Sequence, residues 1–415
     1  MREGYQKTLI GDIPNDWKLK RLKEVADFSN GKGHEQSIDE NGKYIVVNSK
    51  FISTDSRVKK FSNENLCPLN KGDITIVMSD IPNGKAIAKC FIVDEDEKYT
   101  LNQRIGSLTT KEGVDTKFLY FVLNRNRYYL AFDNGVGQTN LRKDEVTDCP
   151  IQFPRLPEQQ KIAEILSTVD TKIEIVNQQI TETQELKKGL MQQLLTGKLS
   201  VVEKRLLNED EMKDSALGKV PKSWEVEELG TLLKDIKGGG TPSKDVPEYW
   251  KDEILWVTVK DLKKLVLDDS IDYISEAGLN NSAANLIPAW TLIISTRMAV
   301  GKAVFVTIDV AINQDLKALF PKDNLNKFFL FHWFFANSDN ILSLASGSTV
   351  KGIRLEVLKG LKLALPSVEE QLEISEILTS FDDKLKVLSE KKATYQELKQ
   401  GLMQQLLTGK VRVKN

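Results

Sequence analysis

The chain has 415 residues, of which 40% are hydrophobic and 28% charged, and its formal net charge at pH 7 is -1. This length allows two domains with sizeable cores, and the near-neutral charge argues against a protein that coats nucleic acid indiscriminately. No run approaches the roughly 18 apolar residues that cross a bilayer, and the first residues lack an apolar signal core, so we expect a cytoplasmic protein without membrane contact.

The first predicted domain covers residues 1–155 and opens with GDIPNDWKLKRL from Gly11. Short β-branched runs predict strands in KYIVVNSKF from Lys43 and DITIVMSD from Asp73, and TKFLYFVLN from Thr116 predicts a helix. Such a mixture without regular βαβ alternation is typical of an α+β domain.

A long helix is predicted over residues 156–198. Its apolar residues recur at positions 162, 166, 169, 173, 176 and 180, which is a heptad seam. Pro157 marks its first turn and Gly197 its end. We expect about 38 helical residues, followed by a linker over residues 199–217.

The second half repeats the first. GKVPKSWEVEEL from Gly218 opens a domain predicted over residues 218–364, with strands in EILWVTV from Glu253 and TLIISTR from Thr291 and a helix in NKFFLFHWFFAN from Asn326. A second long helix is predicted over residues 365–410, where Ser367 and Glu370 suggest a capping box, and residues 411–415 form a tail.

The two helical segments are near copies. GLMQQLLTGK occurs at residues 189–198 and again at 401–410, and residues 158–201 match 370–413 without a gap at about half of their positions. The domain interiors are related only faintly, as in LNQRIGSL from Leu101 and INQDLKAL from Ile312. We therefore expect an α+β protein with a pseudo-twofold internal repeat, in which two similar α/β domains are separated by two long antiparallel coiled-coil helices.

The LMQQLL segments have a wider apolar face than one partner helix requires. We therefore expect them to dock another subunit, and we expect charges at Leu194 and Leu406 to abolish that assembly while the chain stays folded. The predicted docking residues are Leu190, Met191, Leu194, Leu195, Leu402, Met403, Leu406 and Leu407.

Catalytic and metal-binding motifs do not stand out. There is no P-loop and no Pro-Pro pair of the kind found in adenine methyltransferase motifs, and the Asp-x-Lys triplets from Asp96, Asp115 and Asp382 are expected by chance in so charged a chain. Cys67, Cys90 and Cys149 form no CxxC pair, so we expect buried thiols rather than disulfides or a zinc site. We predict no catalytic residue, no metal site and no cofactor in this chain.

Binding chemistry is concentrated in two matched loops, GVGQTNLRKDEV from Gly135 and SGSTVKGIRLEVL from Ser346, in which Arg142 aligns with Arg354. Gln, Asn, Arg and Lys are the side chains that contact base edges and phosphates. The candidate DNA-binding residues are Arg57, Lys59, Lys60, Arg125, Arg127, Gln138, Asn140, Arg142, Lys143, Arg297, Ser348, Thr349, Lys351 and Arg354.

With these motifs the chain resembles, over essentially its whole length, the specificity subunit (HsdS) of type I restriction-modification systems. The residues that carry the resemblance are the domain openings at residues 11–17 and 218–224, the helix starts near Pro157 and Pro366, and the LLTGK endings at 194–198 and 406–410. One departure is SNGKG from Ser29, where the second half has the more usual KGGGTP from Lys237. This leaves the role of that loop in the first domain open.

The resemblance implies that two target recognition domains each read one half of a bipartite site in double-stranded DNA, with the helices as a ruler for the spacer. It implies two methyltransferase (modification) subunits as partners and allows two restriction subunits. S-adenosylmethionine, ATP and magnesium would then belong to those partners. Two other readings of the sequence are a coiled-coil scaffold with two protein-binding globular ends, and a nuclease or methyltransferase with an unrecognised site.

Overall fold

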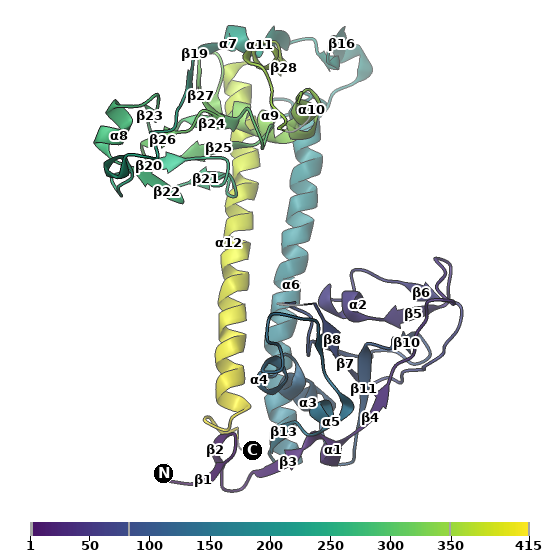
Figure 1. The fold of residues 1–415 in the computed structure, drawn as a ribbon. Coiled ribbons are helices and arrows are strands. Elements are labelled where there is room, and N and C mark those ends of the chain that lie inside the picture. The colour runs from purple at the N-terminus through teal and green to yellow at the C-terminus, as the bar shows by residue number, and fades with distance from the viewer. Residues whose placement is uncertain (1–2, 82–83, 348–349, 414–415) are drawn as a thin grey trace. The chain divides into compact units, whose positions relative to one another are not determined.

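Two long helices dominate the computed structural model, which describes residues 3–81, 84–347 and 350–413. Helix α6 spans Leu156–Leu194 and helix α12 spans Val368–Leu406, each with 39 residues (Figure 1). At 1.5 Å per residue each is about 58 Å long. Gly197 and Gly409 follow them with φ of 68° and 67°, the left-handed conformation expected of C-terminal glycines. The predicted long helices are therefore confirmed.

The chain divides into two compact units, and each unit contains part of both long helices. Unit 1 comprises residues 1–178 and 390–415, and unit 2 comprises residues 179–389. Unit 1 therefore contains the N-terminal part of α6 with the C-terminal part of α12, and unit 2 contains the complementary parts. In both units the beginning of one helix lies beside the end of the other, so the pairing is antiparallel.

Unit 1 is a mixed α+β body. A hairpin joins β1 (Tyr5–Thr8) and β2 (Gly11–Pro14), and β3 (Lys18–Arg21) pairs with β13 (Pro150–Phe153). The main sheet has the order β4 (Ala26–Asn30), β11 (Ile105–Thr110), β7 (Ile74–Val77) and β9 (Cys90–Ile92). The smaller sheets are β10 (Tyr99–Leu101), β5 (Tyr44–Val47) and β6 (Phe61–Ser62), and β12 (Thr139–Asn140) with β8 (Ser79–Asp80). The short helices are α1 (Leu22–Val25), α2 (Ser49–Ser53), α3 (Thr116–Leu123), α4 (Arg127–Leu130) and α5 (Lys143–Thr147).

Unit 2 repeats this plan. β16 (Met212–Ser215) pairs with β17 (Gly218–Pro221), β18 (Glu225–Glu228) with β28 (Lys362–Leu365), and β14 (Leu199–Ser200) with β15 (Arg205–Leu206). One sheet has the order β19 (Leu233–Gly238), β27 (Leu316–Pro321), β24 (Leu292–Ser295), β25 (Ala303–Val306) and β21 (Val266–Leu267). The other has β22 (Asp272–Ile274), β20 (Ile254–Val257), β26 (Val310–Ile312) and β23 (Asn285–Ile287). The helices are η1 (Glu209–Glu211), α7 (Leu229–Leu232), η2 (Pro247–Tyr249), α8 (Glu276–Asn280), α9 (Lys327–Ala336), α10 (Ser338–Ser343) and α11 (Leu355–Lys359).

The strand and helix patterns read from the sequence are found in place. The runs from Lys43 and Asp73 give β5 and β7, and those from Glu253 and Thr291 give β20 and β24. All four residues of β7 and of β24 are buried, as expected for β-branched runs in central strands. The fold class inferred from the sequence is therefore confirmed.

The tryptophan of each domain opening is hydrogen-bonded to a glutamate in the first turn of the following long helix, and we call this contact the clamp. The indole Nε1 of Trp17 donates to Glu158 Oε2 at 3.0 Å, and that of Trp224 donates to Glu370 Oε2 at 2.9 Å. The predicted capping box at Ser367 is therefore half right. Ser367 Oγ accepts from the Glu370 backbone N–H, while the Glu370 carboxylate accepts from Trp224 instead of returning to the cap.

The glutamine beside each clamp glutamate fixes the start of a globular helix. Gln159 Oε1 accepts from the backbone N–H of Asp115, and Gln371 Oε1 accepts from that of Asn326, at 2.9 and 2.7 Å. Asp115 and Asn326 are the N-caps of α3 and α9. Each long helix is thereby joined to the core helix of its own globular domain.

The chain itself buries half of the predicted partner-docking residues, Met191, Leu194, Leu195 and Leu406, so these four are core residues. Leu190, Leu402, Met403 and Leu407 are partly buried, and docking there stays a prediction. Leu194 and Leu406 are 1% and 2% exposed. Met191, Leu194 and Leu195 lie in the unit 2 core with Trp224, and Leu190 packs against it. In unit 1, Leu406 is buried with Trp17, and Leu402, Met403 and Leu407 pack against the same cluster. A charge at Leu194 or Leu406 would therefore disrupt folding rather than assembly alone.

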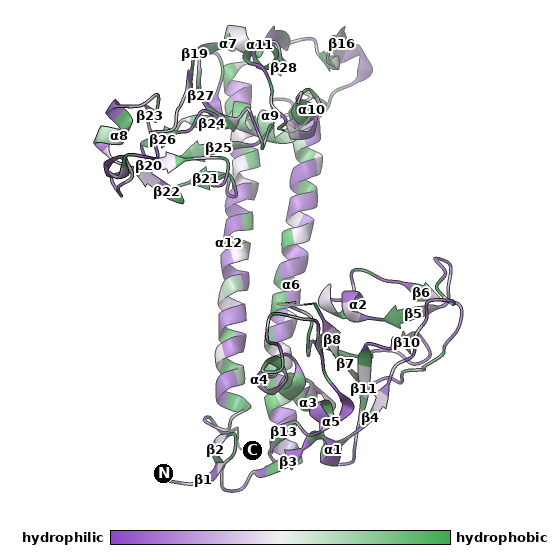
Figure 2. Ribbon diagram, in the orientation of Figure 1, coloured by the Kyte–Doolittle hydropathy of each residue, from purple (hydrophilic) through white to green (hydrophobic). Residues whose placement is uncertain are grey.

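The long helices are mainly hydrophilic at their surfaces. Figure 2 shows α6 and α12 largely purple with interrupted green bands, as a two-helix seam requires. Over the part of the chain that the structure describes, no helix is both long and apolar enough to cross a membrane.

Candidate nucleic-acid interface

Four segments meet at one end of the sheets in unit 1. They are the glycine loop after β4, the Asn102–Gln103 turn before β11, the segment after β7, and the predicted loop over residues 135–142. The Lys32 N–H donates to Leu101 O at 3.0 Å, Met78 N–H donates to Arg104 O at 3.0 Å, and Leu141 N–H donates to Met78 O at 2.7 Å. Backbone bonds thus hold all four segments in one cluster.

Unit 2 builds the same cluster from equivalent segments. The Gly240 N–H donates to Ile312 O at 3.0 Å, Thr296 N–H donates to Asp315 O at 2.9 Å, and Ile353 N–H donates to Thr296 O at 2.9 Å. The glycine loop here is the GGGTP segment, and the turn is Asn313–Gln314. We call the two assemblies loop cluster 1 and loop cluster 2.

Glycine is required where each glycine loop crosses the turn. A Cβ at Gly31 would lie 2.0 Å from the carbonyl oxygen of Asn102, and one at Gly239 would lie 1.8 Å from that of Ile312. These are backbone atoms that cannot move aside. The glycines of SNGKG and KGGGTP therefore allow the same close approach of the two backbone segments, in spite of the different sequences.

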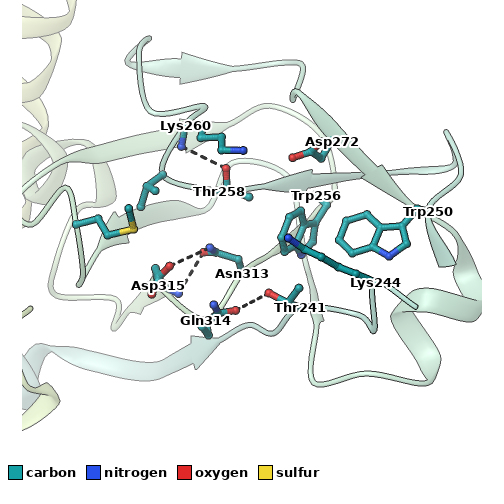
Figure 3. Close-up of a pocket in the computed structure, with 12 residues that line it drawn as sticks. Thr241, Lys244, Trp250, Trp256, Thr258, Lys260, Asp272, Asn313, Gln314 and Asp315 are labelled. Carbon is teal, nitrogen blue, oxygen red and sulfur yellow. Dashed lines mark hydrogen bonds between the residues drawn. The ribbon is translucent and has the colours of Figure 1, made fainter. Parts of the chain in front are cut away.

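Each turn holds its asparagine and exposes its glutamine. In loop cluster 2, Asn313 is buried and bonded to Asp315 through both its amide atoms, while the neighbouring Gln314 is exposed. Gln314 Oε1 accepts from Thr241 Oγ1 at 2.6 Å (Figure 3). In loop cluster 1 the exposed Gln103 donates from Nε2 to Glu35 Oε1 at 2.9 Å.

A hollow of about 750 Å³ opens beside Gln314. Figure 3 shows Trp250 and Trp256 on one wall, with their rings 5.1 Å apart and edge to face, and Lys244 alongside. Both indole N–H groups are bonded to backbone carbonyls of the glycine loop region, Ser243 and Gly240. The polar groups that line the hollow are Thr241, Lys244, Thr258, Lys260, Asp272, Asn313, Gln314 and Asp315.

The two predicted recognition loops are equivalent, as their alignment indicated. Leu141 and Ile353 are both buried, while Arg142 and Arg354 are exposed and stand at the N-caps of α5 and α11. Lys143 follows Arg142 and lies over the ring of Phe28 at 5.9 Å. A buried apolar residue therefore anchors each loop and leaves the next arginine at the surface.

Other candidates in the matched loops also reach the clusters. Gln138 Nε2 donates to Ser79 Oγ at 2.6 Å and to Asn140 Oδ1 at 3.2 Å. Arg297 pairs through its backbone with Gly352, and its guanidinium lies 3.4 Å from the Asp315 carboxylate. The Lys351 carbonyl accepts from Met298 N–H. Ser348 and Thr349 lie outside the described residues.

Two groups of candidates lie elsewhere in unit 1. Arg57, Lys59 and Lys60 are exposed on the segment between α2 and β6. Arg125 and Arg127 line a separate hollow of about 580 Å³ against α12, together with Lys399, Lys410 and three glutamines. This second hollow is basic, and no carboxylate lines it.

The residues that suggested other chemistry have structural roles. Asp115 caps α3, Asp96 accepts from the Lys71 backbone N–H, and Asp382 pairs with Lys187. Cys90 and Cys149 are buried free thiols, and burial raises the pKa of Cys149 to about 12. No group of three or more potential metal ligands occurs within residues 3–81, 84–347 and 350–413.

Sequence reasoning missed the glutamines and the glycine loops as parts of the candidate interface. The signal was present, because NQ recurs at Asn102 and Asn313 within otherwise divergent interiors. By itself this recurrence indicates only duplication. The pairing of each NQ turn with a glycine loop about 70 residues earlier became visible only in the fold.

Comparisons with known proteins agree with this architecture. The type I restriction modification DNA specificity domain matches the chain twice, over residues 14–185 and 221–400. The MjaVIII specificity subunit of a type I restriction enzyme from Methanocaldococcus jannaschii is 26% identical over 423 residues, covering 97% of this chain and 95% of that protein.

Two solved structures share the fold. The S subunit of a type I restriction-modification system from M. genitalium superposes with a TM-score of 0.62 at 16% identity, covering 94% of this chain and 96% of that one. A chain from a type I system, solved to explain complex assembly and conformational transition, gives 0.53 at 18% identity, covering 96% and 99%. The resemblance inferred from the sequence is thus confirmed, and the chain belongs to the type I restriction modification DNA specificity domain family.

Proposed function

We propose that this chain is the DNA-reading subunit of a type I restriction-modification complex and that each loop cluster reads one half of a bipartite site. The observation that carries the proposal is the double match to a DNA specificity domain, in which each match contains one loop cluster. The clusters have the same backbone plan and different side chains. Two half-sites of different sequence are therefore expected.

Phosphate contacts would position each unit, and base contacts would select the sequence. Arg142, Lys143 and Arg354 stand at the edges of the loop clusters and suit the first role. The basic hollow at Arg125 and Arg127 offers a further phosphate contact in unit 1. The antiparallel helices would set the spacer length, so a heptad added to both should lengthen it.

The chain would act without catalysis. The carboxylates of the three Asp-x-Lys triplets are occupied, Asp115 as a helix cap, Asp96 by a backbone N–H and Asp382 by Lys187, which supports chemistry on partner subunits. Two methyltransferase subunits would supply S-adenosylmethionine, and restriction subunits, where present, would use ATP and magnesium. One structural relative comes from work on the complex assembly of a type I system, which supports such partners.

A duplicated apolar surface on the helices suits two copies of a methyltransferase subunit. Unit 1 exposes Ile175 and Leu398 by 50% and 47%, and unit 2 exposes Leu186 and Val387 by 56% and 61%. Ile175 corresponds to Val387 and Leu186 to Leu398 in the repeat. The recurrence of exposed apolar residues at the same positions of both repeats supports a partner that binds twice.

All four residues share one orientation. Each stands one position before a buried apolar residue, Val176 or Leu388, or before a lysine that pairs with the other long helix, Lys187 or Lys399. Each is therefore turned about 100° from that residue in the same sense. In an antiparallel pair with twofold symmetry, the two apolar residues of one unit then lie on the same side of the helices. Leu186→Asp with Leu398→Asp should abolish methyltransferase binding, whereas Gln193→Asp with Gln405→Asp on exposed helix positions should not.

The proposed function is tested by sequencing methylated bases in a methylation-free host. The chain is expressed with the methyltransferase encoded beside it, and the methyltransferase alone is the control. A bipartite methyladenine motif that requires this chain is expected. A stable complex that leaves the DNA unmethylated would favour instead a scaffold with two protein-binding ends.

A further inference from the structure

We propose that Gln103 and Gln314 are specificity-determining residues, each contacting one base edge in its half-site with its side-chain amide. The inference rests on the proposed function. It assigns base selection to the Asn102–Gln103 and Asn313–Gln314 turns, whereas the arginines of the recognition loops are assigned to phosphate contacts. Glutamine is suited to this task because its amide offers both a donor and an acceptor to the major-groove edges of bases.

Each glutamine is exposed by a turn whose remaining residues are fixed. In loop cluster 2 the buried residues Asn313 and Asp315 flank Gln314 and bond to each other. The Thr296 N–H bond to Asp315 O then fixes the turn to the neighbouring strand end. A base-reading side chain needs such a rigid support, because a loosely held amide loses entropy on binding.

The glycine loops hold the glutamines without covering them. Gly31 and Gly239 pass so close to the backbone of the turn that a side chain there would collide with it. The loop then supplies one hydrogen-bond partner to each glutamine, Glu35 in loop cluster 1 and Thr241 in loop cluster 2. These partners orient the amide and leave its other end for a base.

The two amides are oriented in opposite senses. A carboxylate only accepts, so Glu35 holds the NH₂ group of Gln103 and leaves Oε1, which lies near Gly33, as the acceptor for a base. Thr241 donates to Oε1 of Gln314 and leaves the NH₂ group as an outward donor. Gln103 therefore suits a base edge with a donor, such as the exocyclic amine of cytosine or adenine. Gln314 suits an acceptor, such as O6 or N7 of a purine or O4 of thymine.

The surroundings of each glutamine fit a nucleic acid. Gln314 lines the hollow of about 750 Å³ with Lys244 and Lys260. Gln103 lies beside Arg104, which is exposed, whereas the matching residue in unit 2 is the buried Asp315. Cations close to an amide provide phosphate attraction without sequence preference and leave selection to the amide.

The test compares the methylated motif of the wild-type complex with those of Gln103→Ala and Gln314→Ala complexes in the methylation-free host. Each change should relax one base position in one half-site and leave the other half intact. The preference at that position should fall about 5- to 100-fold, the range expected for loss of one good base contact. Gln193→Ala and Gln405→Ala, exposed glutamines on the long helices, are the matched controls and should leave the motif unchanged.

A second variant tests the polarity. Gln314→Glu replaces the outward donor by an acceptor, so it should shift the preferred base at the affected position toward one with an exocyclic amine. Affinities of purified complexes for single-base variants of the site provide the readout if methylation in cells is lost. Unchanged base preference in the alanine complexes would overturn the inference while leaving the proposed function standing. A wild-type complex without any bipartite motif would instead remove the proposed function itself.

Discussion

At the scale of single residues, the repeat explains pairs of side chains that would look unremarkable alone. Asp170 recurs as Asp382 and Lys187 recurs as Lys399 in the two long helices. In unit 2, Lys187 Nζ lies 2.6 Å from Asp382 Oδ1, and in unit 1 Lys399 Nζ lies 2.6 Å from Asp170 Oδ1. Each lysine also lies over a phenylalanine of its globular domain, at 5.2 Å from Phe335 or 5.4 Å from Phe121.

His332 should make the stability of unit 2 depend on pH. Burial, with the nearby Lys187, lowers the pKa of His332 to about 3, and its Nδ1 has no hydrogen-bond partner. Because the unfolded chain takes up a proton near pH 6.5, the stabilisation is complete above that pH and is lost as the pH falls from 6.5 toward 3. From pH 7 to pH 5 the loss should be about 2 kcal/mol.

Urea unfolding at pH 7 and pH 5 measures this loss. His332→Gln, which cannot titrate, should show a smaller decrease than the wild type over the same interval. Asp382, whose pKa is raised by burial in spite of the bond from Lys187, is present in both proteins and cancels in the comparison. Equal decreases in the two proteins would show that His332 is solvated.

Glycines in the two GLMQQLLTGK copies should respond to alanine with opposite signs. Gly197 has positive φ, and a Cβ there would lie 2.3 Å from Pro221 Cγ, while Gly409 stands against Pro14 at 2.5 Å. Alanine at either position should destabilise the chain by about 2 kcal/mol or more. Gly189 and Gly401 lie within the helices with nothing within 4 Å of a Cβ, so alanine there should stabilise by about 1 kcal/mol each. Thermal unfolding of the four variants would distinguish these effects, and a uniform sign would contradict the packing described.

At the scale of elements, the long helices combine a short apolar seam with ion pairs that specify register. The antiparallel pairing joins Asp170 to Lys399 and Lys187 to Asp382, and a shift of one residue would break both bonds. Buried polar contacts of this kind are best known as devices that fix register and orientation. We infer the same role for them here.

The Lys187–Asp382 pair should be energetically coupled. The Lys187 side chain is only 6% exposed, so Lys187→Ala leaves a mostly buried carboxylate without its partner and should cost about 3 kcal/mol. The double variant with Asp382→Ala should recover part of this loss. Lys399→Ala should cost less, because that pair is more exposed. Chemical denaturation is the measurement, Lys188→Ala on the exposed face is the control, and additive single effects would exclude coupling.

Sequence patterns predicted the long helices and central strands because heptads, β-branched runs and terminal glycines are local signals. The burial of Met191, Leu194, Leu195 and Leu406, which the sequence assigned to a docking face, has a physical reason. A wide apolar face shows only that something covers it, and here Trp17 and Trp224 of the same chain do so. The clamp, the ion pairs and the NQ turns join residues far apart in the sequence, so only the three-dimensional structure could place them.

At the scale of the whole molecule, each candidate reading surface is confined to one globular segment. Loop cluster 2 uses residues 238–241, 296–298, 313–315, 346–347 and 350–354, all within the domain predicted over residues 218–364. The long helices contribute nothing to the contacts that define it. The candidate reading surface and the long helices are therefore separate parts of the chain.

Replacing residues 218–364 by the corresponding segment of a relative should change one half-site only. The other half-site and the spacer should stay as they were, because loop cluster 1 and both helices are untouched. Sequencing of methylated DNA from the complex with the chimeric chain is the measurement. A change in both halves would mean that one globular segment influences the reading of the other.

Unit 1 is built from two chain segments that are synthesised at different times, one before unit 2 and one after it. Unit 2 is one continuous stretch, whereas unit 1 needs residues 390–413, which the ribosome makes only after unit 2 is complete. Before these residues are synthesised, the cluster that contains Phe118, Ile162 and Leu166 lacks Leu406 and the neighbouring apolar residues of α12. The core of the first globular domain can thus be completed only after unit 2 has been synthesised, and apolar side chains exposed in the meantime make a nascent chain prone to aggregation.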